Sequence, residues 1–230
     1  MGNEYRIALA GNPNTGKSTL FNALTGLRQH TGNWAGKTVS LAQGSVQHKG
    51  HTFNMIDLPG TYSLFSNSKD EEVARNYIVF EKPDLTLVVL DATSLERNFN
   101  LALQVLEMTK NVLICINLID VAEQQGIHIN ERLLTNRLGV PVIKISARNK
   151  KGFPLLLDTI ERIVTGAIEC QPVQMKYPDE IEERIQKIEP KVREIVGDRF
   201  SSRWVALRLL DGDETLLKEL GGRLVPEGAL

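Results

Sequence analysis

The chain has 230 residues, of which 42% are hydrophobic and 24% charged, and its formal net charge is −1. This composition is ordinary for a globular protein, and the near-neutral charge excludes a global basic field that would recruit nucleic acid or an anionic membrane. The two cysteines, Cys115 and Cys170, have neither zinc-ligand spacing nor the pattern of a disulfide framework, which favours a reducing compartment. We find no signal peptide and no run of about eighteen apolar residues, so we expect a soluble polypeptide. A membrane segment beyond Leu230 in a longer product stays open.

From Tyr5 to about Phe153, short apolar runs alternate with amphipathic helical stretches, a pattern typical of a doubly wound α/β sheet. Four runs are nearly continuous in apolar residues, as buried parallel strands should be: Ile7–Ala10, Leu85–Leu90, Val112–Ile116 and Val142–Ile145. A hairpin is predicted where residues 39–47 and 52–56 flank His48-Lys49-Gly50-His51. We interpret its histidines as solvated turn residues, because no third metal ligand is near them in the sequence.

The segment Gly11-Asn12-Pro13-Asn14-Thr15-Gly16-Lys17-Ser18 stands between the first predicted strand and a predicted helix. Two glycines with four residues between them, followed by Lys and Ser, form the phosphate-loop pattern. The glycines let backbone N–H groups approach phosphates, Lys17 can reach the terminal phosphates, and the Ser18 hydroxyl can ligate Mg²⁺. A glycine-rich turn with a surface lysine is the weaker alternative. The segment therefore predicts binding of a nucleoside triphosphate.

Three shorter motifs follow predicted strands, at the edge where ligands of open α/β sheets gather. In Asp57-Leu58-Pro59-Gly60, the carboxylate can hold Mg²⁺ through a water and the Gly60 N–H can meet a terminal phosphate. Asn117 and Asp120 supply an amide and a carboxylate that match a guanine edge, whereas adenine would leave them unpaired. The backbone of Ser146-Ala147-Arg148 could meet the guanine carbonyl. Each motif alone is weak, but their order and placement indicate a guanine nucleotide site.

These residues assemble into the ordered motifs of the Ras-like G protein superfamily. Within it, the segments 11–22, 32–39 and 57–64 closely resemble the N-terminal cytosolic domain of bacterial ferrous iron transporters of the FeoB family. The most specific part is Gly-Asn-Trp-x-Gly-x-Thr-Val, which begins at Gly32. The resemblance covers the whole chain and implies a Ras-like fold, a mixed and mostly parallel sheet flanked by helices, in residues 1–165. It implies a small all-α domain in residues 166–230.

The resemblance also implies roles for individual residues. Thr38 becomes the first-switch threonine that closes on Mg²⁺ and the γ-phosphate, and the Mg²⁺ ligands are Ser18, Thr38 and Asp57. Potassium is implied as a second cofactor, held by Asn14 with backbone carbonyls around Gly32 and Trp34, where it would stabilise transition-state charge. The catalytic set is Asn14, Lys17, Thr38 and Gly60. The nucleotide-binding set is Gly11, Asn12, Pro13, Asn14, Thr15, Gly16, Lys17, Ser18, Thr19, Thr38, Asp57, Leu58, Pro59, Gly60, Asn117, Asp120, Ser146, Ala147 and Arg148.

Some positions depart from the related patterns. Thr61 stands where Ras-like enzymes have a glutamine that orients water, so we name no general base. Ala35 stands where the family commonly has proline. Two switch loops, 27–37 and 61–69, are expected to order around the γ-phosphate. After Pro172, helices are predicted over 179–196, 201–210 and 213–220, which resemble the domain proposed to slow GDP release.

The resemblance implies a GTP-binding and slowly GTP-hydrolysing regulatory domain that is stimulated by potassium and couples nucleotide state to Fe²⁺ uptake. Its implied place is the cytoplasmic face of the bacterial inner membrane. Its implied partners are GTP or GDP, the membrane-spanning portion of the same transporter and possibly a second copy, with no nucleic acid. Two alternatives stay open: an RNA-associated G protein of ribosome assembly or RNA modification, and a phosphate-loop kinase, which the guanine motif disfavours.

Overall fold

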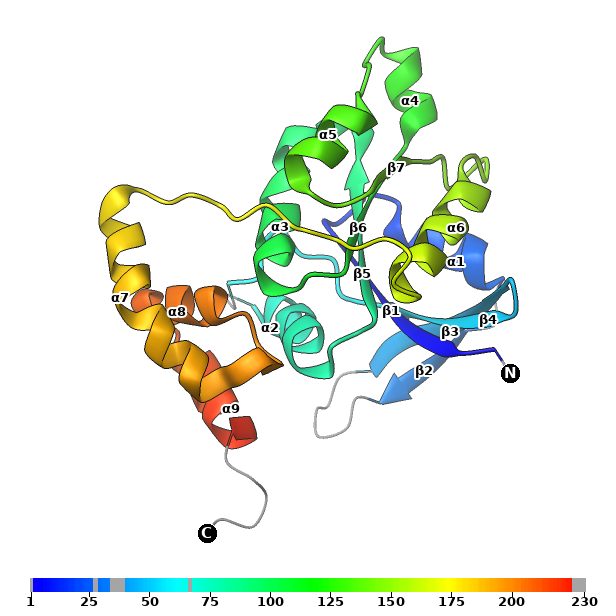
Figure 1. Ribbon diagram of the computed structural model, residues 1–230. Helices are drawn as coiled ribbons and strands as arrows, with labels where there is room; N and C mark the ends of the chain where they lie inside the picture. The colour runs from blue at the N-terminus through cyan, green and yellow to red at the C-terminus, as the bar shows by residue number, and fades with distance from the viewer. Residues whose placement is uncertain (1, 27–28, 34–39, 66–67, 225–230) are drawn as a thin grey trace. The chain divides into compact units, whose positions relative to one another are not determined.

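The computed structural model describes residues 2–26, 29–33, 40–65 and 68–224 (Figure 1). The chain divides into two compact units, Met1–Val173 and Gln174–Leu230, and each is described by itself.

The first unit is built on one seven-stranded sheet with the order β2-β3-β4-β1-β5-β6-β7. The strands β1, β5, β6 and β7 are parallel, and β4 is parallel to β1, while β3 is antiparallel to both β2 and β4. The predicted mixed, mostly parallel sheet is thus confirmed. The strands are β1 Glu4–Gly11, β2 Gln29–Asn33, β3 Ser40–His48, β4 His51–Asp57, β5 Leu85–Asp91, β6 Val112–Asn117 and β7 Val142–Lys144.

Helices cover both faces of this sheet, with α1 and α6 on one side and α2 and α3 on the other (Figure 1). The helices of the first unit are α1 Lys17–Thr25, α2 Lys69–Asn76, α3 Leu95–Met108, α4 Ile119–Gln124, α5 Glu131–Leu138 and α6 Phe153–Val164. A short π-helical segment, Tyr77–Glu81, continues α2, and a 3₁₀ turn, Ala92–Ser94, precedes α3.

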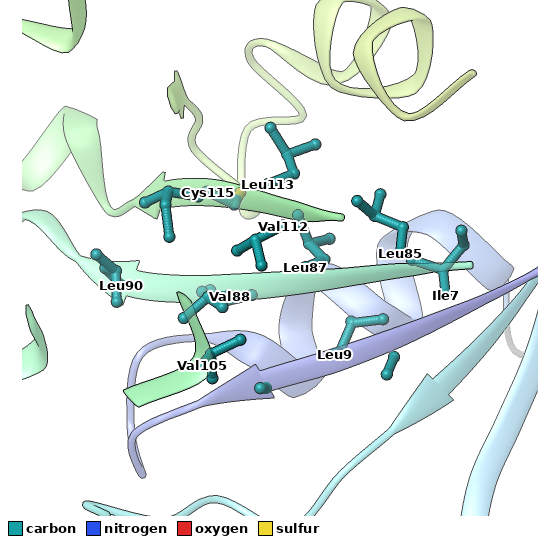
Figure 2. Packing of buried hydrophobic residues seen from close by; sticks show 14 of the residues in the cluster. Ile7, Leu9, Leu85, Leu87, Val88, Leu90, Val105, Val112, Leu113 and Cys115 are labelled. Carbon is teal, nitrogen blue, oxygen red and sulfur yellow. The ribbon is translucent and has the colours of Figure 1, made fainter. Parts of the chain in front are cut away.

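The central strands are buried on both faces because helices cover both. Every residue of β6 is buried, and Leu85–Leu90 of β5 are buried as well. Figure 2 shows these side chains packed together with Ile7 and Leu9 of β1 and Val105 of α3. Cys115 has no exposed surface, and burial raises the pKa of its thiol, so this cysteine is a core residue. The near-continuous apolar runs in the sequence were the correct signal for these strands.

One strand lies inside a segment that the sequence analysis treats as a loop. Residues 27–37 are polar and glycine-rich, yet β2 occupies Gln29–Asn33 and pairs with β3 from Gln29 opposite Gly44 to Asn33 opposite Ser40. The sequence QHTGN shows no apolar alternation. Its strand conformation therefore comes from pairing with β3, at the edge of the sheet.

The predicted β3–β4 hairpin is confirmed, with His48 opposite His51 and a two-residue turn at Lys49 and Gly50. Both turn residues have positive φ, 46° and 83°, as the tight turns that suit hairpin twist require. The interpretation of His48 as a solvated turn residue is wrong. Its side chain is 17% exposed and its Nε2 lies 2.8 Å from Oδ1 of Asp158 on α6.

The segment 166–173, which follows α6, packs with the first unit. The Ile168 N–H bonds the Arg162 carbonyl at 2.8 Å, and Cys170 is buried in the same core as the sheet. Gln171 and Val173 donate their N–H groups to the carbonyls of Gly139 and Leu138. The compact units therefore divide after Val173, beyond the expected boundary at residue 165.

The second unit consists of helices α7 Asp179–Val196, α8 Ser202–Asp211 and α9 Glu214–Leu224, with a 3₁₀ turn at Gly197–Arg199. The hydroxyl of Ser201 accepts the Trp204 N–H, and Asp213 caps α9 by accepting the Leu216 N–H at 3.0 Å. Trp204 is buried, and Arg203 binds both carboxylate oxygens of Glu182 at 3.0 and 2.7 Å. Within the described ranges, no helix has both the length and the apolar character needed to cross a membrane.

Candidate functional site

The motif residues meet at the carboxyl ends of neighbouring strands. Leu9 of β1 stands opposite Asp57 of β4, and the β5–β6 register ends with Asp91 opposite Asn117. Because β1, β4, β5 and β6 run in the same direction, the loops that follow them open at one edge of the sheet. The phosphate loop, the segment after Asp57 and the segment after Asn117 are therefore neighbours.

The phosphate loop needs backbone conformations that most residues resist. Gly16 has φ 77° at the N-cap of α1, and Asn14 has φ 68°. A Cβ on Gly11 would come within 2.7 Å of the Val89 carbonyl oxygen, so only glycine fits beside β5 there. The Thr15 hydroxyl closes the loop by donating to the Asn12 carbonyl at 3.0 Å. The result is a tight turn at the N-terminus of α1, where the backbone N–H groups of a helix suit an anion.

Asn12 is an unusual member of this loop. Its side chain is buried, with the residue 2% exposed, yet neither its amide nitrogen nor its amide oxygen has a hydrogen-bond partner among the described residues. Buried polar groups without partners are costly. The Asn12 amide is thus a candidate contact for a group that enters the site.

Lys17 and Ser18 both face the end of β4. The buried Lys17 ammonium donates to the Asp57 carboxylate and, at 2.6 Å, to the Leu58 carbonyl oxygen. The Ser18 hydroxyl lies 3.4 Å from the second carboxylate oxygen of Asp57. A hydroxyl and a carboxylate that converge in this way are the hard oxygen donors that Mg²⁺ prefers, so these two residues fit that ion.

The segment after Asp57 is fixed against β1. The Leu58 N–H bonds the Leu9 carbonyl at 3.0 Å and the Thr61 N–H bonds the Gly11 carbonyl at 3.2 Å. Gly60 stays exposed between these anchors and packs against Pro13, where a Cβ would lie 3.4 Å from the Pro13 Cα. Thr61 is only 5% exposed, so its side chain lies in the protein.

Asn117 joins the two ends of the site. This fully buried residue donates through Nδ2 to the Thr15 carbonyl and accepts through Oδ1 from the Ala147 N–H, both at 2.9 Å. The absence of a side chain on Gly16 makes room for it, because a Cβ there would lie 2.4 Å from the Asn117 Nδ2. The asparagine thus couples the phosphate loop to the segment after β7.

Asp120 is aimed by a residue that sequence reasoning missed. Asn149 donates through Nδ2 to Oδ2 of Asp120 at 3.0 Å, while Oδ1 of Asp120 is buried and has no partner in the described part of the chain. Leu118, at φ 61°, turns the chain between β6 and α4 so that Asp120 lies in the first turn of α4. The sequence signal for Asn149 was its place directly after Ser146-Ala147-Arg148.

The structure brings together most of the predicted set. Residues 11–18, 57–60, Asn117, Asp120 and Ala147 lie at one edge of the sheet, and Ser146 is buried there. Thr19 and Arg148, which belong to the same motifs, are exposed. Gly32 lies in β2, opposite Leu41, while Trp34, Ala35 and Thr38 lie outside the described residues.

This fold and site define the class: a phosphate-loop α/β domain of the Ras-like type. Residues 5–160 match the family model described as ferrous iron transport protein B, and residues 177–228 match that of the FeoB cytosolic helical domain. The chain belongs to the ferrous iron transport protein B family. The RNA-associated alternative is therefore not favoured.

Similar proteins agree with this assignment. The chain is 36% identical to the Fe(2+) transport protein A/Fe(2+) transporter FeoB fusion protein of Porphyromonas gingivalis, over 96% of this chain and 26% of that protein. It is 39% identical to the Fe(2+) transporter FeoB of Escherichia coli K12, over 90% of this chain and 27% of that protein. The chain thus spans about a quarter of the length of these relatives.

Solved structures show the same fold. The cytosolic domain of the T. maritima FeoB iron transporter in its GMPPNP form has a TM-score of 0.83 and 36% identity, with 96% of this chain and 87% of that chain covered. The FeoB G-domain of Methanococcus jannaschii has a TM-score of 0.64 and 46% identity, with 72% of this chain and 99% of that chain covered.

Proposed function

We propose that this chain binds GTP and GDP, hydrolyses GTP slowly, and acts as the regulatory domain of a ferrous iron transporter. The observation that carries the proposal is the base end of the site. There, a buried asparagine fixes the loop of Ala147, and a carboxylate oxygen of Asp120 is buried with no partner among the residues that the structure describes.

The donor pattern of guanine fits this end. A guanine ring presents an N–H and an exocyclic amine side by side, and both could donate to the Asp120 carboxylate. The Ala147 segment could offer a backbone N–H to the guanine carbonyl. Adenine has no ring N–H at that edge and would leave the Asp120 oxygen desolvated, which costs about 1 to 3 kcal/mol for an unpaired buried polar group. Guanine should therefore be strongly preferred.

The phosphate end supports triphosphate binding. The N–H groups near Gly16 and the dipole of α1 favour an anion, and the Lys17 ammonium lies at the same place. Lys17 is also paired with Asp57 and with the Leu58 carbonyl, and an ammonium has a third N–H that a phosphate could accept. Mg²⁺ bound by Ser18 and Asp57 would supply positive charge next to the phosphates. Lys17 and the Gly60 N–H would then stabilise charge on the terminal phosphate.

The proposed hydrolysis is slow because no residue in the described site is placed to orient water. Thr61, at the position of the glutamine in Ras-like enzymes, is buried and held to Gly11 through its backbone. We propose that GTP hydrolysis is assisted by a K⁺ ion bound by Asn14, Gly32 and Trp34. Thr38 would assist as well. The exposed Asn14 side chain projects from the phosphate loop, and its amide oxygen is a suitable ligand for this cation.

The potassium proposal is tested with two variants of Asn14. Because φ is 68° there, Asn14→Ala adds backbone strain, whereas Asn14→Gly removes the same amide without strain. We expect both variants to bind GDP and to lose potassium stimulation of GTP hydrolysis. If Asn14→Gly keeps full stimulation by K⁺ over Na⁺, the ion-assisted mechanism is wrong.

We further propose that nucleotide state is coupled to Fe²⁺ uptake by a membrane-spanning portion of the same transporter. The chain would then lie at the cytoplasmic face of the bacterial inner membrane, with the helical unit as the relay and a second copy as a possible partner. Support comes from the matched relatives, whose names describe Fe(2+) transporters. Binding of nucleic acid is not expected.

The central experiment is competition for a fluorescent GDP analogue in magnesium buffer. GTP and GDP should displace it, and ATP should fail at concentrations about a hundredfold higher. Equal displacement by ATP would favour a phosphate-loop kinase. Tight, salt-sensitive retention of RNA on a filter would favour the RNA-associated alternative.

A further inference from the structure

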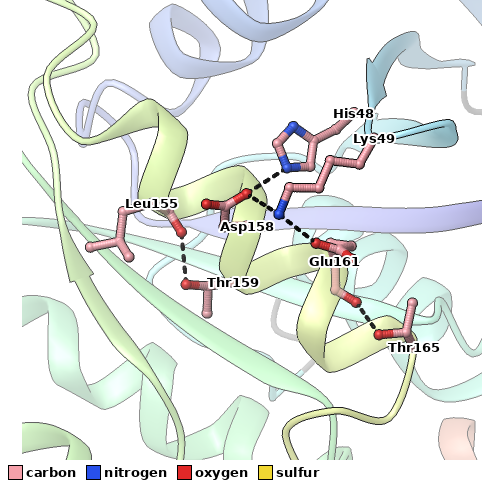
Figure 3. A network of polar contacts seen from close by, with 7 residues as sticks. All are labelled: His48, Lys49, Leu155, Asp158, Thr159, Glu161 and Thr165. Carbon is pink, nitrogen blue, oxygen red and sulfur yellow. Dashed lines mark hydrogen bonds and ion pairs between the residues drawn. The ribbon is translucent and has the colours of Figure 1, made fainter.

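A second polar cluster lies away from the nucleotide site, between the β3–β4 hairpin and α6. The Nε2 of His48 lies 2.8 Å from Oδ1 of Asp158, and the Lys49 ammonium lies 2.8 Å from the same oxygen. Lys49 also contacts Oε2 of Glu161 at 3.1 Å. Figure 3 shows the hairpin side chains meeting the two carboxylates of the helix.

The fold brings these groups together from distant parts of the sequence. Asp158 and Glu161 are three residues apart on α6, so they lie on one face of the helix. His48 ends β3, and the centroid of its ring lies 6.2 Å from that of Phe53 on β4, so the two rings pack together on the hairpin. The tight turn at Lys49 and Gly50 then presents the hairpin end to the helix.

The donor set suits a transition metal. In the described part of the chain, His48, Asp158 and Glu161 form a group whose possible ligand atoms all lie within 4.8 Å of one another. Atoms that bind one tetrahedral Zn²⁺ at about 2.0 to 2.2 Å stand about 3.4 Å from one another. The 2.8 Å between His48 and Asp158 must therefore open slightly, and separations that approach 4.8 Å must close by about 1 Å, which side-chain rotation can supply. One imidazole with two carboxylates favours first-row ions over Mg²⁺ and Ca²⁺, which prefer oxygen alone.

The cluster also attracts positive charge. The Lys49 ammonium already bridges both carboxylates. Glu161 and His48 are the more buried partners, with side chains 21% and 17% exposed. A divalent ion would bring more charge than the ammonium, together with bonds to the imidazole.

We propose that His48, Asp158 and Glu161 bind a divalent first-row metal ion such as Zn²⁺, Mn²⁺ or Fe²⁺, in competition with the ammonium of Lys49. The site lies at the start of β4, whereas Asp57 lies at its end. At about 3.3 Å per residue the two are about 20 Å apart, so this ion is distinct from the Mg²⁺ of the nucleotide site. Three protein ligands would leave further positions to water.

The test is metal titration of the full chain, loaded with GDP in excess Mg²⁺ so that the nucleotide site is saturated. Calorimetry with Zn²⁺ and Mn²⁺ should show one site per chain. Co²⁺ should give visible absorption bands that change when His48→Gln removes the imidazole. We expect His48→Gln and Glu161→Gln each to weaken Zn²⁺ binding at least about tenfold.

Lys49→Met separates this site from a simple ion-pair contact. Removing the competing ammonium should strengthen metal binding about tenfold, whereas a purely structural cluster would bind no metal in either form. His51→Gln, on the same hairpin but outside the group, is the matched control and should leave affinity unchanged. Unchanged GDP affinity would show that each variant is folded. Absence of stoichiometric binding, or Lys49→Met binding no tighter than the native chain, would overturn the proposal.

Discussion

The two ends of the nucleotide site are held in different ways. At the base end, Asn117 is fully buried and bonded to two backbone groups, and Asn149 holds Asp120. At the phosphate end, Lys17 is paired with Asp57, a residue that is also a candidate metal ligand. The base end is thus held by neutral hydrogen bonds within the protein, whereas at the phosphate end the cation is paired with a carboxylate that Mg²⁺ would also contact. The difference suggests that recognition of the base is separable from the response to the phosphates.

The largest effect should come from removing the cation of the phosphate end. Lys17→Met deletes the ammonium that would meet the terminal phosphates, and charge-assisted hydrogen bonds contribute about 1.5 to 3 kcal/mol each. We expect GTP, GDP and xanthosine nucleotides all to bind about a thousandfold more weakly. Displacement of a fluorescent GDP analogue measures this, with thermal unfolding as the control for folding. Selective loss of one base type would contradict the comparison.

A change at the base end should act on the base alone. Asp120→Asn replaces an acceptor by a donor, so guanine should lose about a hundredfold in affinity. Xanthine, which carries an oxygen where guanine has its amine, should gain affinity. The same displacement assay with GTP and xanthosine triphosphate checks this exchange. If both triphosphates weaken equally, Asp120 does not read the base.

Asn149 is a second test of the base end, because it donates a hydrogen bond to Asp120 and would act on the base only through that residue. Asn149→Ala removes one hydrogen bond of about 1 kcal/mol, so GDP affinity should fall about fivefold. Asn149→Asp places a like charge beside Asp120 and should be worse than alanine. Faster GDP release in stopped-flow measurements would accompany both changes. An alanine variant with native release would show that the helix turn alone holds Asp120.

The smallest effect on nucleotide affinity is expected from a change in the second unit, at the Glu182 carboxylate that is paired with Arg203. Arg203, and then the Tyr177 N–H, lower the pKa of Glu182 from 4.5 to about 2. Because the pKa is lower in the folded chain, Glu182 stabilises the second unit above about pH 4.5, and this contribution is lost as the pH falls towards about 2. Glu182→Gln should leave GDP affinity unchanged and lower stability at neutral pH.

Urea denaturation followed by Trp204 emission, in a Trp34→Phe background, measures that change in stability. The difference between the native chain and the Glu182→Gln variant should shrink when the pH is lowered through this window. A difference that stays constant with pH would mean that charge is not its origin.

The sequence was sufficient to predict those parts of the fold and of the site that have a strong local pattern, such as an apolar run followed by a motif. The phosphate loop begins at the end of β1, whose last five residues are buried, and Asn117 ends β6, which is buried throughout. The meeting of these motifs with Asp57 and Asp120 at one edge could therefore be predicted from their order along the chain. The strand β2 could not, because its polar residues are ordered by pairing with β3. The contact of His48 with Asp158 joins residues 110 positions apart and has no signal in either local sequence.

The segment by which the chain leaves the first unit is anchored next to β7, so a force on this segment would act there first. Gln171 and Val173 are bonded to Gly139 and Leu138, and a Cβ on Gly139 would lie 1.8 Å from the Gln171 oxygen, so the two segments touch without any intervening side chain. Gly139 leads directly into β7 and on to the loop of Ala147. Tension along the connection to the helical unit would therefore act beside β7, the strand that leads to the loop of Ala147. Lys17 lies on α1 and Asp57 ends β4, so the tension would reach them only through the rest of the first unit.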